Sequence, residues 1–324
     1  MAEPNLSPEA QKLISKTPAI DFDAPLDLSI LKNRSVLITG GAVGLGFATA
    51  ETIASHGAIV TLADIQEEAG KAAAENLSSK GYKVGFVYCD VTSYESQYQA
   101  FKFAIEFGGG KLDVVIPNAG VIAQKNLFDM AATTEPSLEN PPPEPGFSGV
   151  DINLKGVYYS CYLALHYFRL TVPADATPFK KAIVLIASLA GYVGYPYSTT
   201  YSISKFGVRG LFYGIREKGL RESPQVRVNL VAPWYIKTPM VESLDPVSAA
   251  NIQLLGFVPI EEVVDAIVRL SADEGLSGRS AGVFPEARVD LGDDIWDGYG
   301  GRVTGEHVAI RMSKFAETLA RMKK

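Results

Sequence analysis

Within residues 201–205, a phenol (Tyr201) and an ammonium group (Lys205) stand four positions apart. On a helix, side chains at positions i and i+4 lie on one face, about 5–6 Å apart. Free tyrosine is a poor base at neutral pH, but a neighbouring cation favours the phenolate and lowers the pKa. The spacing therefore predicts that Tyr201 acts as a general base or acid, assisted by Lys205. In isolation, the same spacing is usually an ordinary surface pair.

Composition places the chain among ordinary soluble globular proteins. Of its residues, 47% are hydrophobic and 20% are charged. The length of 324 residues is enough for one large α/β domain or two ordinary ones. The net charge of -6 argues against a nucleic-acid surface. Two cysteines, Cys89 and Cys161, are too few for a disulfide framework or a thiolate metal site. The histidines are scattered along the chain, so we expect no histidine metal site either. We expect a cytoplasmic protein, because residues 1–16 do not resemble a secretory signal and no apolar run reaches membrane-spanning length.

Short apolar runs alternate with helical segments along most of the chain. Strands are expected at 35–39, 58–64, 83–89, 112–116, 182–187, 226–231 and 281–284, and the helices between them include 151–170 and 198–220. This alternation predicts an α/β fold: a Rossmann-type, doubly wound parallel sheet of about seven strands in a single domain. The domain is expected at 34–289, between an N-terminal extension (1–33) and a C-terminal tail (290–324). The proline-rich stretch 136–146 is interpreted as a loop insertion.

The first expected strand runs into a glycine-rich turn that opens a helix. Glycines at 40, 44 and 46 would let backbone N–H groups approach a pyrophosphate, and the start of the helix adds a favourable dipole. Asp64 follows roughly twenty residues later, where a carboxylate accepts hydrogen bonds from the adenosine ribose and repels a 2′-phosphate. No arginine or lysine lies within residues 39–56. The sequence therefore favours NAD over NADP.

The turn reads Thr-Gly-x-x-x-Gly-x-Gly, and with the Tyr-x-x-x-Lys pair it resembles the short-chain dehydrogenase/reductase family. The resemblance covers roughly residues 34–285 and includes motifs after the third, fourth and sixth strands. It implies a cofactor site made of Gly40, Val43, Gly44, Leu45, Gly46, Asp64, Ile65, Asp90, Val91, Asn118, Ala119, Gly120, Tyr201, Lys205, Pro233, Ile236 and Thr238. The family usually has glycine where this chain has Trp234, which leaves the shape of that loop open.

The same resemblance implies a catalytic set of Asn153, Ser188, Tyr201 and Lys205. Ser188 ends the fifth expected strand, thirteen positions before Tyr201 (201 − 188), where ligands bind in open α/β sheets. In the family the serine hydrogen-bonds the substrate oxygen. The tyrosine takes the hydroxyl proton, its pKa lowered by the lysine and the nicotinamide, and the lysine also holds the nicotinamide ribose. Asn153 would hold a water chain to the lysine. The ordinary alternatives are a strand-end hydroxyl for Ser188 and a helix cap for Asn153.

Aromatic side chains crowd the expected substrate side, where Tyr195 and Trp234 are the candidate substrate contacts and loop packing is the alternative. Within the family the chain looks most like 15-hydroxyprostaglandin dehydrogenase-type and fungal 5′-hydroxyaverantin dehydrogenase-type enzymes. This likeness implies NAD-dependent oxidation of a hydrophobic, lipid- or polyketide-like secondary alcohol to a ketone. It also implies a homodimer or homotetramer paired through helices 151–170 and 198–220. The rival functions are an NADPH-linked ketone reductase and a non-catalytic dinucleotide sensor.

Overall fold

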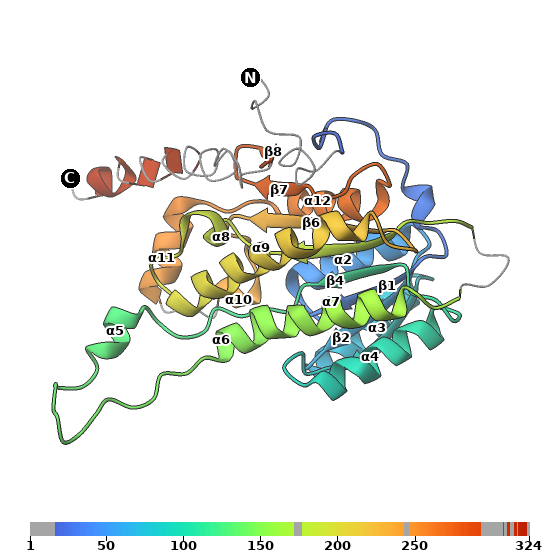
Figure 1. Cartoon of the computed structure of the whole chain (residues 1–324). Coiled ribbons are helices and arrows are strands. Elements are labelled where there is room, and N and C mark those ends of the chain that lie inside the picture. Colours follow the sequence, from blue (N-terminus) through green and yellow to red (C-terminus); the bar gives the residue numbers. More distant parts are fainter. Residues whose placement is uncertain are drawn as a thin grey trace, which may run out of the picture.

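Within the described residues, eight strands form one sheet at the centre of the protein (Figure 1). The structure is a computed structural model that describes residues 17–171, 177–242, 246–292, 307, 310–311, 314–315 and 317–322. In chain order the strands are β1 (Ser35–Thr39), β2 (Ile59–Asp64), β3 (Lys83–Tyr88), β4 (Val114–Pro117), β5 (Lys181–Ile186), β6 (Val226–Pro233), β7 (Ser280–Val283) and β8 (Arg288–Asp290). Their order across the sheet is β3-β2-β1-β4-β5-β6-β7-β8.

The pairing confirms the predicted doubly wound parallel sheet. Neighbouring strands from β3 to β7 are parallel, and the short β8, which the sequence did not indicate, adds an antiparallel edge to β7. The strand order reverses between β1 and β4, where Val36 lies opposite both Val60 and Val114. In open α/β sheets, ligands bind in the crevice at the carboxyl ends of the strands beside such a reversal.

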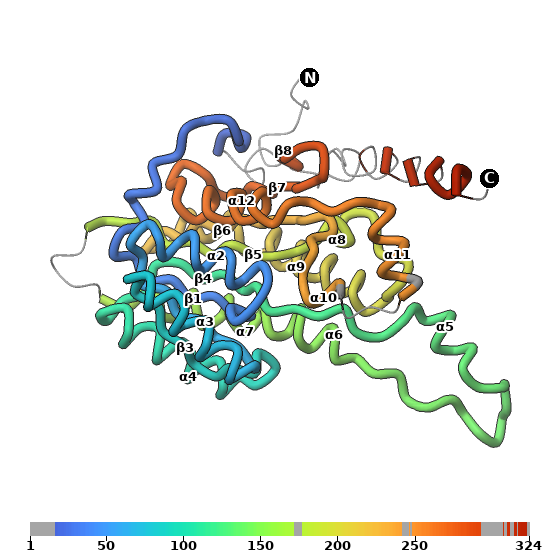
Figure 2. Tube along the Cα trace, turned by 180° about the vertical axis from the view of Figure 1, so that it is seen from behind, coloured from blue at the N-terminus to red at the C-terminus, as the bar shows by residue number. Residues whose placement is uncertain are grey.

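Helices cover both faces of the sheet (Figures 1 and 2). The helical elements of the described residues are η1 (Leu28–Leu31), α2 (Gly44–Ser55), α3 (Glu67–Ser79), α4 (Tyr94–Phe107), α5 (Leu127–Ala131), α6 (Ser148–Val150), η2 (Asp151–Lys155), α7 (Gly156–Tyr167), α8 (Ala190–Val193), α9 (Thr199–Gly219), α10 (Pro239–Glu242), α11 (Pro246–Leu255) and α12 (Ile260–Ala272). Because successive strand side chains point to opposite faces, Val36 and Ile38 pack with α2, α3 and α12. Leu37 packs on the other face with α4, α7 and α9. No described helix is long and apolar enough to cross a membrane.

The helix expected at 151–170 is interrupted near its start. It begins earlier, with α6 at Ser148, passes through the π-helical turn η2 (Asp151–Lys155) and continues as α7 to Tyr167. A π-helical turn inserts an extra residue into a helix and is frequent at functional sites. Here the turn contains Asn153, which is fully buried.

Two segments lie outside the α/β layers. The arm that contains α5 and the proline-rich insertion projects from the body of the protein (Figures 1 and 2), and residues 131–148 are exposed. The second segment, residues 17–33, packs over α12: Arg269 donates to the carbonyl oxygens of Phe22 and Ala24, and Ile20 and Leu31 are buried in the core. Residues 1–16 of the expected extension and 293–306 of the expected tail lie outside the described residues.

Candidate active site

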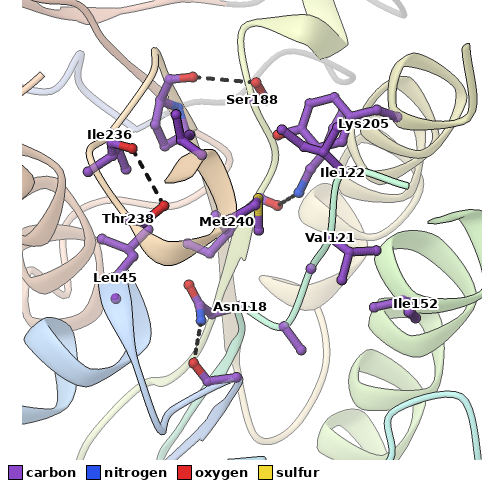
Figure 3. Close-up of a pocket in the computed structure, with 18 of the residues that line it drawn as sticks. Leu45, Asn118, Val121, Ile122, Ile152, Ser188, Lys205, Ile236, Thr238 and Met240 are labelled. Carbon is purple, nitrogen blue, oxygen red and sulfur yellow. Dashed lines mark hydrogen bonds between the residues drawn. The ribbon is translucent and has the colours of Figure 1, made fainter. Parts of the chain in front are cut away.

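A cavity of about 950 Å³ lies at the carboxyl ends of β1 to β6. All the site residues predicted from the sequence line it except Gly46 and Asn153, and Figure 3 shows part of this lining. The predicted residues in the lining are Gly40, Val43, Gly44, Leu45, Asp64, Ile65, Asp90, Val91, Asn118, Ala119, Gly120, Ser188, Tyr195, Tyr201, Lys205, Pro233, Trp234, Ile236 and Thr238. The structure thus brings together residues that are up to about two hundred positions apart in the chain (238 − 40).

The glycine turn after β1 is closely packed against its surroundings. A Cβ atom at Gly40 would lie 2.7 Å from the Cα atom of Ala119, and one at Gly46 would overlap the carbonyl oxygen of Gly40. The absence of a side chain at Gly46 therefore lets α2 pack closely against the turn. Gly46 faces the Gly40 carbonyl group, which explains why this residue does not line the cavity. The backbone of the turn remains open toward the cavity at the start of α2, an arrangement that fits a pyrophosphate.

Asn118 holds this turn to the end of β4. Its Nδ2 atom donates to the carbonyl oxygens of Thr39 and Gly40, both at 3.0 Å. In return, the backbone N–H groups of Asn118 and Ala119 donate to Thr39 Oγ1 at 3.1 Å. Asn118 lines the cavity, but in the structure its amide group serves to fix the two strand ends (Figure 3).

Asp64 is held at the cavity edge by the backbone around it. Its Oδ2 accepts the Ala42 N–H and its Oδ1 accepts the Gln66 N–H, both at 3.0 Å. Each carboxylate oxygen has a second lone-pair site, so Asp64 can also accept hydrogen bonds from ribose hydroxyls. Among the described lining residues, Lys205 is the one lysine or arginine. These groups fit a nicotinamide dinucleotide, with Asp64 at its adenosine end.

Ser188 and Tyr201 form the centre of the site. The Ser188 Oγ accepts the Ala190 N–H at 3.2 Å and lies 3.4 Å from the Pro233 carbonyl oxygen (Figure 3). Tyr201 lies in the first turn of α9, which Ser198 caps by accepting the Tyr201 N–H at 3.3 Å. The Ser188 hydroxyl lies near enough to that of Tyr201 to lower the pKa of the phenol. The two hydroxyls can therefore share one substrate oxygen.

The direction of the tyrosine pKa differs from the sequence prediction. Burial raises the pKa of Tyr201 to about 12, and the neighbouring Ser188 hydroxyl only partly offsets this. The Lys205 Nζ lies 5.6 Å from the centre of the Tyr201 ring and donates to the Ile186 carbonyl oxygen at 3.0 Å. Burial also lowers the pKa of Lys205 to about 8. The spacing in sequence correctly predicts that the two side chains are neighbours, but the desolvation of both groups outweighs the attraction that the spacing suggests.

Asn153 lies behind the cavity wall and acts through the backbone of Val121. Its Oδ1 accepts the Val121 N–H, and its Nδ2 donates to the Val121 carbonyl oxygen, both at 2.8 Å. The Nδ2 also donates to Ser204 Oγ at 3.2 Å. Asn153 lies inside η2 and is not its N-cap residue, which is Val150, so the helix-cap alternative is wrong. Asn153 instead positions the loop after β4 against α9, near Lys205.

The part of the cavity beyond Ser188 is apolar and aromatic. Tyr195 contacts Tyr201, with ring centres 5.5 Å apart, and Tyr235, with ring centres 6.3 Å apart. Burial raises the pKa of Tyr235, so its hydroxyl stays neutral. The sequence also places Tyr197 and Tyr235 on this side, but it did not single out the rest of the wall, which consists of Val121, Ile122, Ile152, Val193, Met240, Val241 and Leu255. The available signal was the aromatic run after β6, whereas the aliphatic residues come from loops and helices whose positions only the fold reveals.

One half of the described cavity lining, with the glycine turn and Asp64, has groups that suit a dinucleotide, and the other half is neutral and apolar. The hydroxyl groups of Ser188 and Tyr201 lie between the two halves. In the part of the chain that the structure describes, no group of three or more histidine, cysteine, aspartate or glutamate side chains could hold a metal ion. The chemistry that this arrangement supports is proton transfer to or from an apolar alcohol or ketone beside a nicotinamide.

Comparison with known proteins agrees with this geometry. The family profile described as short chain dehydrogenase matches residues 34–248. A 5′-hydroxyaverantin dehydrogenase from Dothistroma septosporum is 42% identical over 284 residues, which covers 85% of this chain and 92% of the relative. A 5′-hydroxyaverantin dehydrogenase from Emericella nidulans is 39% identical, and the match covers 86% of this chain and 93% of the relative. An NADP-dependent dehydrogenase from a Phoma species is 33% identical, and the match covers 86% of this chain and 83% of the relative. The chain belongs to the short-chain dehydrogenase family.

Proposed function

We propose that this protein oxidises a secondary alcohol on a hydrophobic skeleton to a ketone, with NAD as the hydride acceptor. The observation that carries the proposal is that Ser188 and Tyr201 line one cavity, between the glycine turn with Asp64 on one side and the apolar, aromatic wall on the other. Two hydroxyls at this junction suit a substrate whose reacting oxygen is polar and whose remainder is apolar.

Each residue of the centre has a role in this reaction. A bound nicotinamide dinucleotide would supply the acceptor for the hydride of the carbinol carbon. Ser188 hydrogen-bonds the substrate oxygen, and Tyr201 takes the hydroxyl proton as the general base. Lys205 holds the ribose beside the tyrosine, and its positive charge favours the phenolate when the side chain turns from Ile186 toward the ring. Asn153 acts as a positioning residue through Val121.

The preference for NAD is proposed from Asp64. A carboxylate at the end of β2 favours ribose hydroxyls and repels a 2′-phosphate. The relatives include an NADP-dependent dehydrogenase, so cofactor choice within this group must be measured on this chain. Initial rates with NAD and NADP at equal concentration provide the test. A higher kcat/KM with NADP, or efficient ketone reduction with NADPH alone, would favour the rival reductase function.

The substrate class is proposed from the neutral, aromatic wall around Tyr195 and Tyr235 and from the relatives named as 5′-hydroxyaverantin dehydrogenases. A panel of hydrophobic secondary alcohols, including polyketide-like aromatic ones and lipid-like ones, should reduce NAD, as followed by absorbance. Polar sugar alcohols serve as the comparison. Activity confined to the sugars would refute the proposed substrate class, and dinucleotide binding without any turnover would favour the sensor alternative.

A homodimer or homotetramer is proposed from the outer face of α9. A Cβ atom at Gly210 or Gly214 would meet nothing within 4 Å, whereas one at Gly207 would lie 2.5 Å from Leu154 of the same chain. Phe206 on this helix is a large exposed hydrophobic residue. Light scattering tests the assembly, and a monomer would contradict it.

A cytoplasmic location is also proposed; it is supported by the free thiols of the two cysteines and can be tested by cell fractionation.

A further inference from the structure

Trp234 stands where the family usually has glycine, and both its backbone and its side chain have a defined partner. Its backbone N–H donates to the carbonyl oxygen of Val283 at the end of β7, at 2.9 Å. Its indole Nε1 donates to the carbonyl oxygen of Gly256 at 3.1 Å. The residue therefore connects the end of β6, through its side chain, to the residue that follows α11.

Two further contacts join the same segments of the chain. The Val258 N–H donates to the Tyr235 carbonyl oxygen at 2.8 Å, and Ile236 forms an isolated parallel bridge with Val258. Gly256 has a φ of 81°, and its N–H donates back to Ile252 at 3.1 Å. A glycine in this conformation is a frequent way to end a helix, and it directs the carbonyl group of residue 256 toward the indole.

Both segments reach the substrate half of the cavity. Trp234, Tyr235 and Leu255 all line it, and Leu255 directly precedes the carbonyl group that the indole holds. The Trp234 ring lies against that of Tyr235, with centres 5.0 Å apart, and Tyr235 contacts Tyr195 beside the reacting tyrosine. A displacement of the end of α11 would therefore change the wall that faces the alcohol.

We propose that Trp234 is a positioning residue for the alcohol. Its indole N–H holds the Gly256 carbonyl group, and this bond keeps Leu255 and the Tyr235 ring in the wall of the substrate half. The inference rests on the proposed alcohol dehydrogenase function and adds a specificity role to a residue outside the catalytic set. A glycine at this position would supply neither the ring nor the donor.

Trp234→Phe removes the donor and keeps an aromatic ring. The KM for the alcohol is expected to rise by about two- to twelve-fold, the range that corresponds to the loss of one hydrogen bond. Because the bond that is lost goes to Gly256 and not to the glycine turn or Ser188, kcat and the KM for NAD are expected to change by less than about twofold. A purely structural role would instead lower stability without this split between the two KM values.

A second pair of variants tests the other partner of the bond. Gly256→Ala places a side chain at a φ of 81°, where the backbone is strained and the carbonyl group must shift. The nearest neighbour of the new Cβ would be the Arg311 guanidinium, at 3.5 Å. Gly81→Ala is the matched control, because Gly81 has a φ of 84° and nothing within 4 Å of a Cβ. Both variants should lose stability, and only Gly256→Ala should raise the KM for the alcohol.

Hydrogen exchange of the α11 amides in the ligand-free protein gives a readout that needs no substrate. Trp234→Phe should speed exchange at residues 250–256 and leave the α2 amides unchanged. Unchanged exchange, or an unchanged KM for the alcohol in an active Trp234→Phe enzyme, would overturn the inference alone. If the wild-type protein oxidises no alcohol in the panel, the proposed function fails and the substrate role of Trp234 fails with it.

Discussion

Replacing Lys205 by methionine is expected to abolish turnover and yet to stabilise the folded protein at neutral pH. Burial lowers the pKa of this lysine from 10.5 to about 8. At a pH below 8 the protein must keep a buried positive charge, and the difference between the two pKa values corresponds to about 3 kcal/mol of unfavourable free energy. Methionine has a similar shape without the charge, so it removes this cost.

Part of the gain is lost with the hydrogen bond that the lysine donates. The Lys205 Nζ lies 3.0 Å from the Ile186 carbonyl oxygen, and losing such a bond costs about 1 kcal/mol. The free energy of unfolding should therefore rise by about 2 kcal/mol at pH 7. Between pH 8 and pH 10.5 the unfolded chain binds more protons than the folded one at this site, so wild-type stability rises with pH. The advantage of Lys205→Met should shrink to nearly zero at about pH 9.5.

Urea unfolding of both proteins at pH 7 and at pH 9.5 measures these differences. Lys218→Met is the control, because the Lys218 side chain is 79% exposed and its replacement should change stability by less than about 0.5 kcal/mol at either pH. A Lys205→Met protein that is less stable than wild type at pH 7 would refute the reasoning. A stability difference that does not depend on pH would refute it equally.

The remaining predictions concern the base, the glycine turn and the buried asparagine. Tyr201→Phe should keep NAD affinity in calorimetry and lose about 10²- to 10⁴-fold in turnover; near-wild-type rates would exclude the tyrosine as the base. Because the pKa of Tyr201 is about 12 in the ligand-free protein, kcat/KM for oxidation should increase with pH between pH ~6 and ~8, and a flat profile would contradict this. Gly46→Ala should abolish NAD binding, because the new Cβ would overlap the Gly40 carbonyl oxygen; normal binding would show that the turn can adjust. Asn153→Ala should lower the free energy of unfolding by about 2–4 kcal/mol, because Val121 loses both partners; an unchanged melting temperature would argue against this.

The sheet and the positions of the reacting residues could be predicted because local patterns determine them. Apolar runs such as 35–39 become buried parallel strands, and parallel strands bring their carboxyl ends to one edge. Ser188 and Tyr201 fit this rule, since Ser188 follows the end of β5 by two positions and Tyr201 lies in the first turn of α9. That both residues line one cavity agrees with the motif spacing and the topology of the sheet.

The electrostatics of the site could not be predicted in the same way. The sequence places a cation four residues from a phenol, but it does not show that Tyr201 and Lys205 are both desolvated. It also does not show that the lysine donates to a backbone carbonyl group. Burial depends on everything packed around the pair, including Tyr195 from a separate loop, and that packing decides the sign of the tyrosine pKa shift.

Backbone irregularities were equally hidden. Nothing in the residues around Asn153 distinguishes a π-helical turn from an ordinary helix start, because both have the same hydrophobic pattern. The three-residue strand β8 (Arg288–Asp290) is too short to show an alternation of its own. It pairs with β7, and its Asp290 carboxylate accepts two hydrogen bonds from the Arg279 guanidinium, at 2.6 and 2.9 Å.

That carboxylate has a consequence for anyone who shortens this protein. Asp290 also accepts the Ile20 N–H at 2.6 Å, so one side chain joins segments from opposite ends of the described chain. The family profile spans only residues 34–248, and a polypeptide trimmed to those limits would lack β7, β8 and α12 and would leave one flank of β6 unpaired. We therefore expect the smallest autonomous folding unit to be longer than the segment by which the family is recognised, and trimming at residues 17 and 292 should preserve solubility where trimming at 34 and 248 does not.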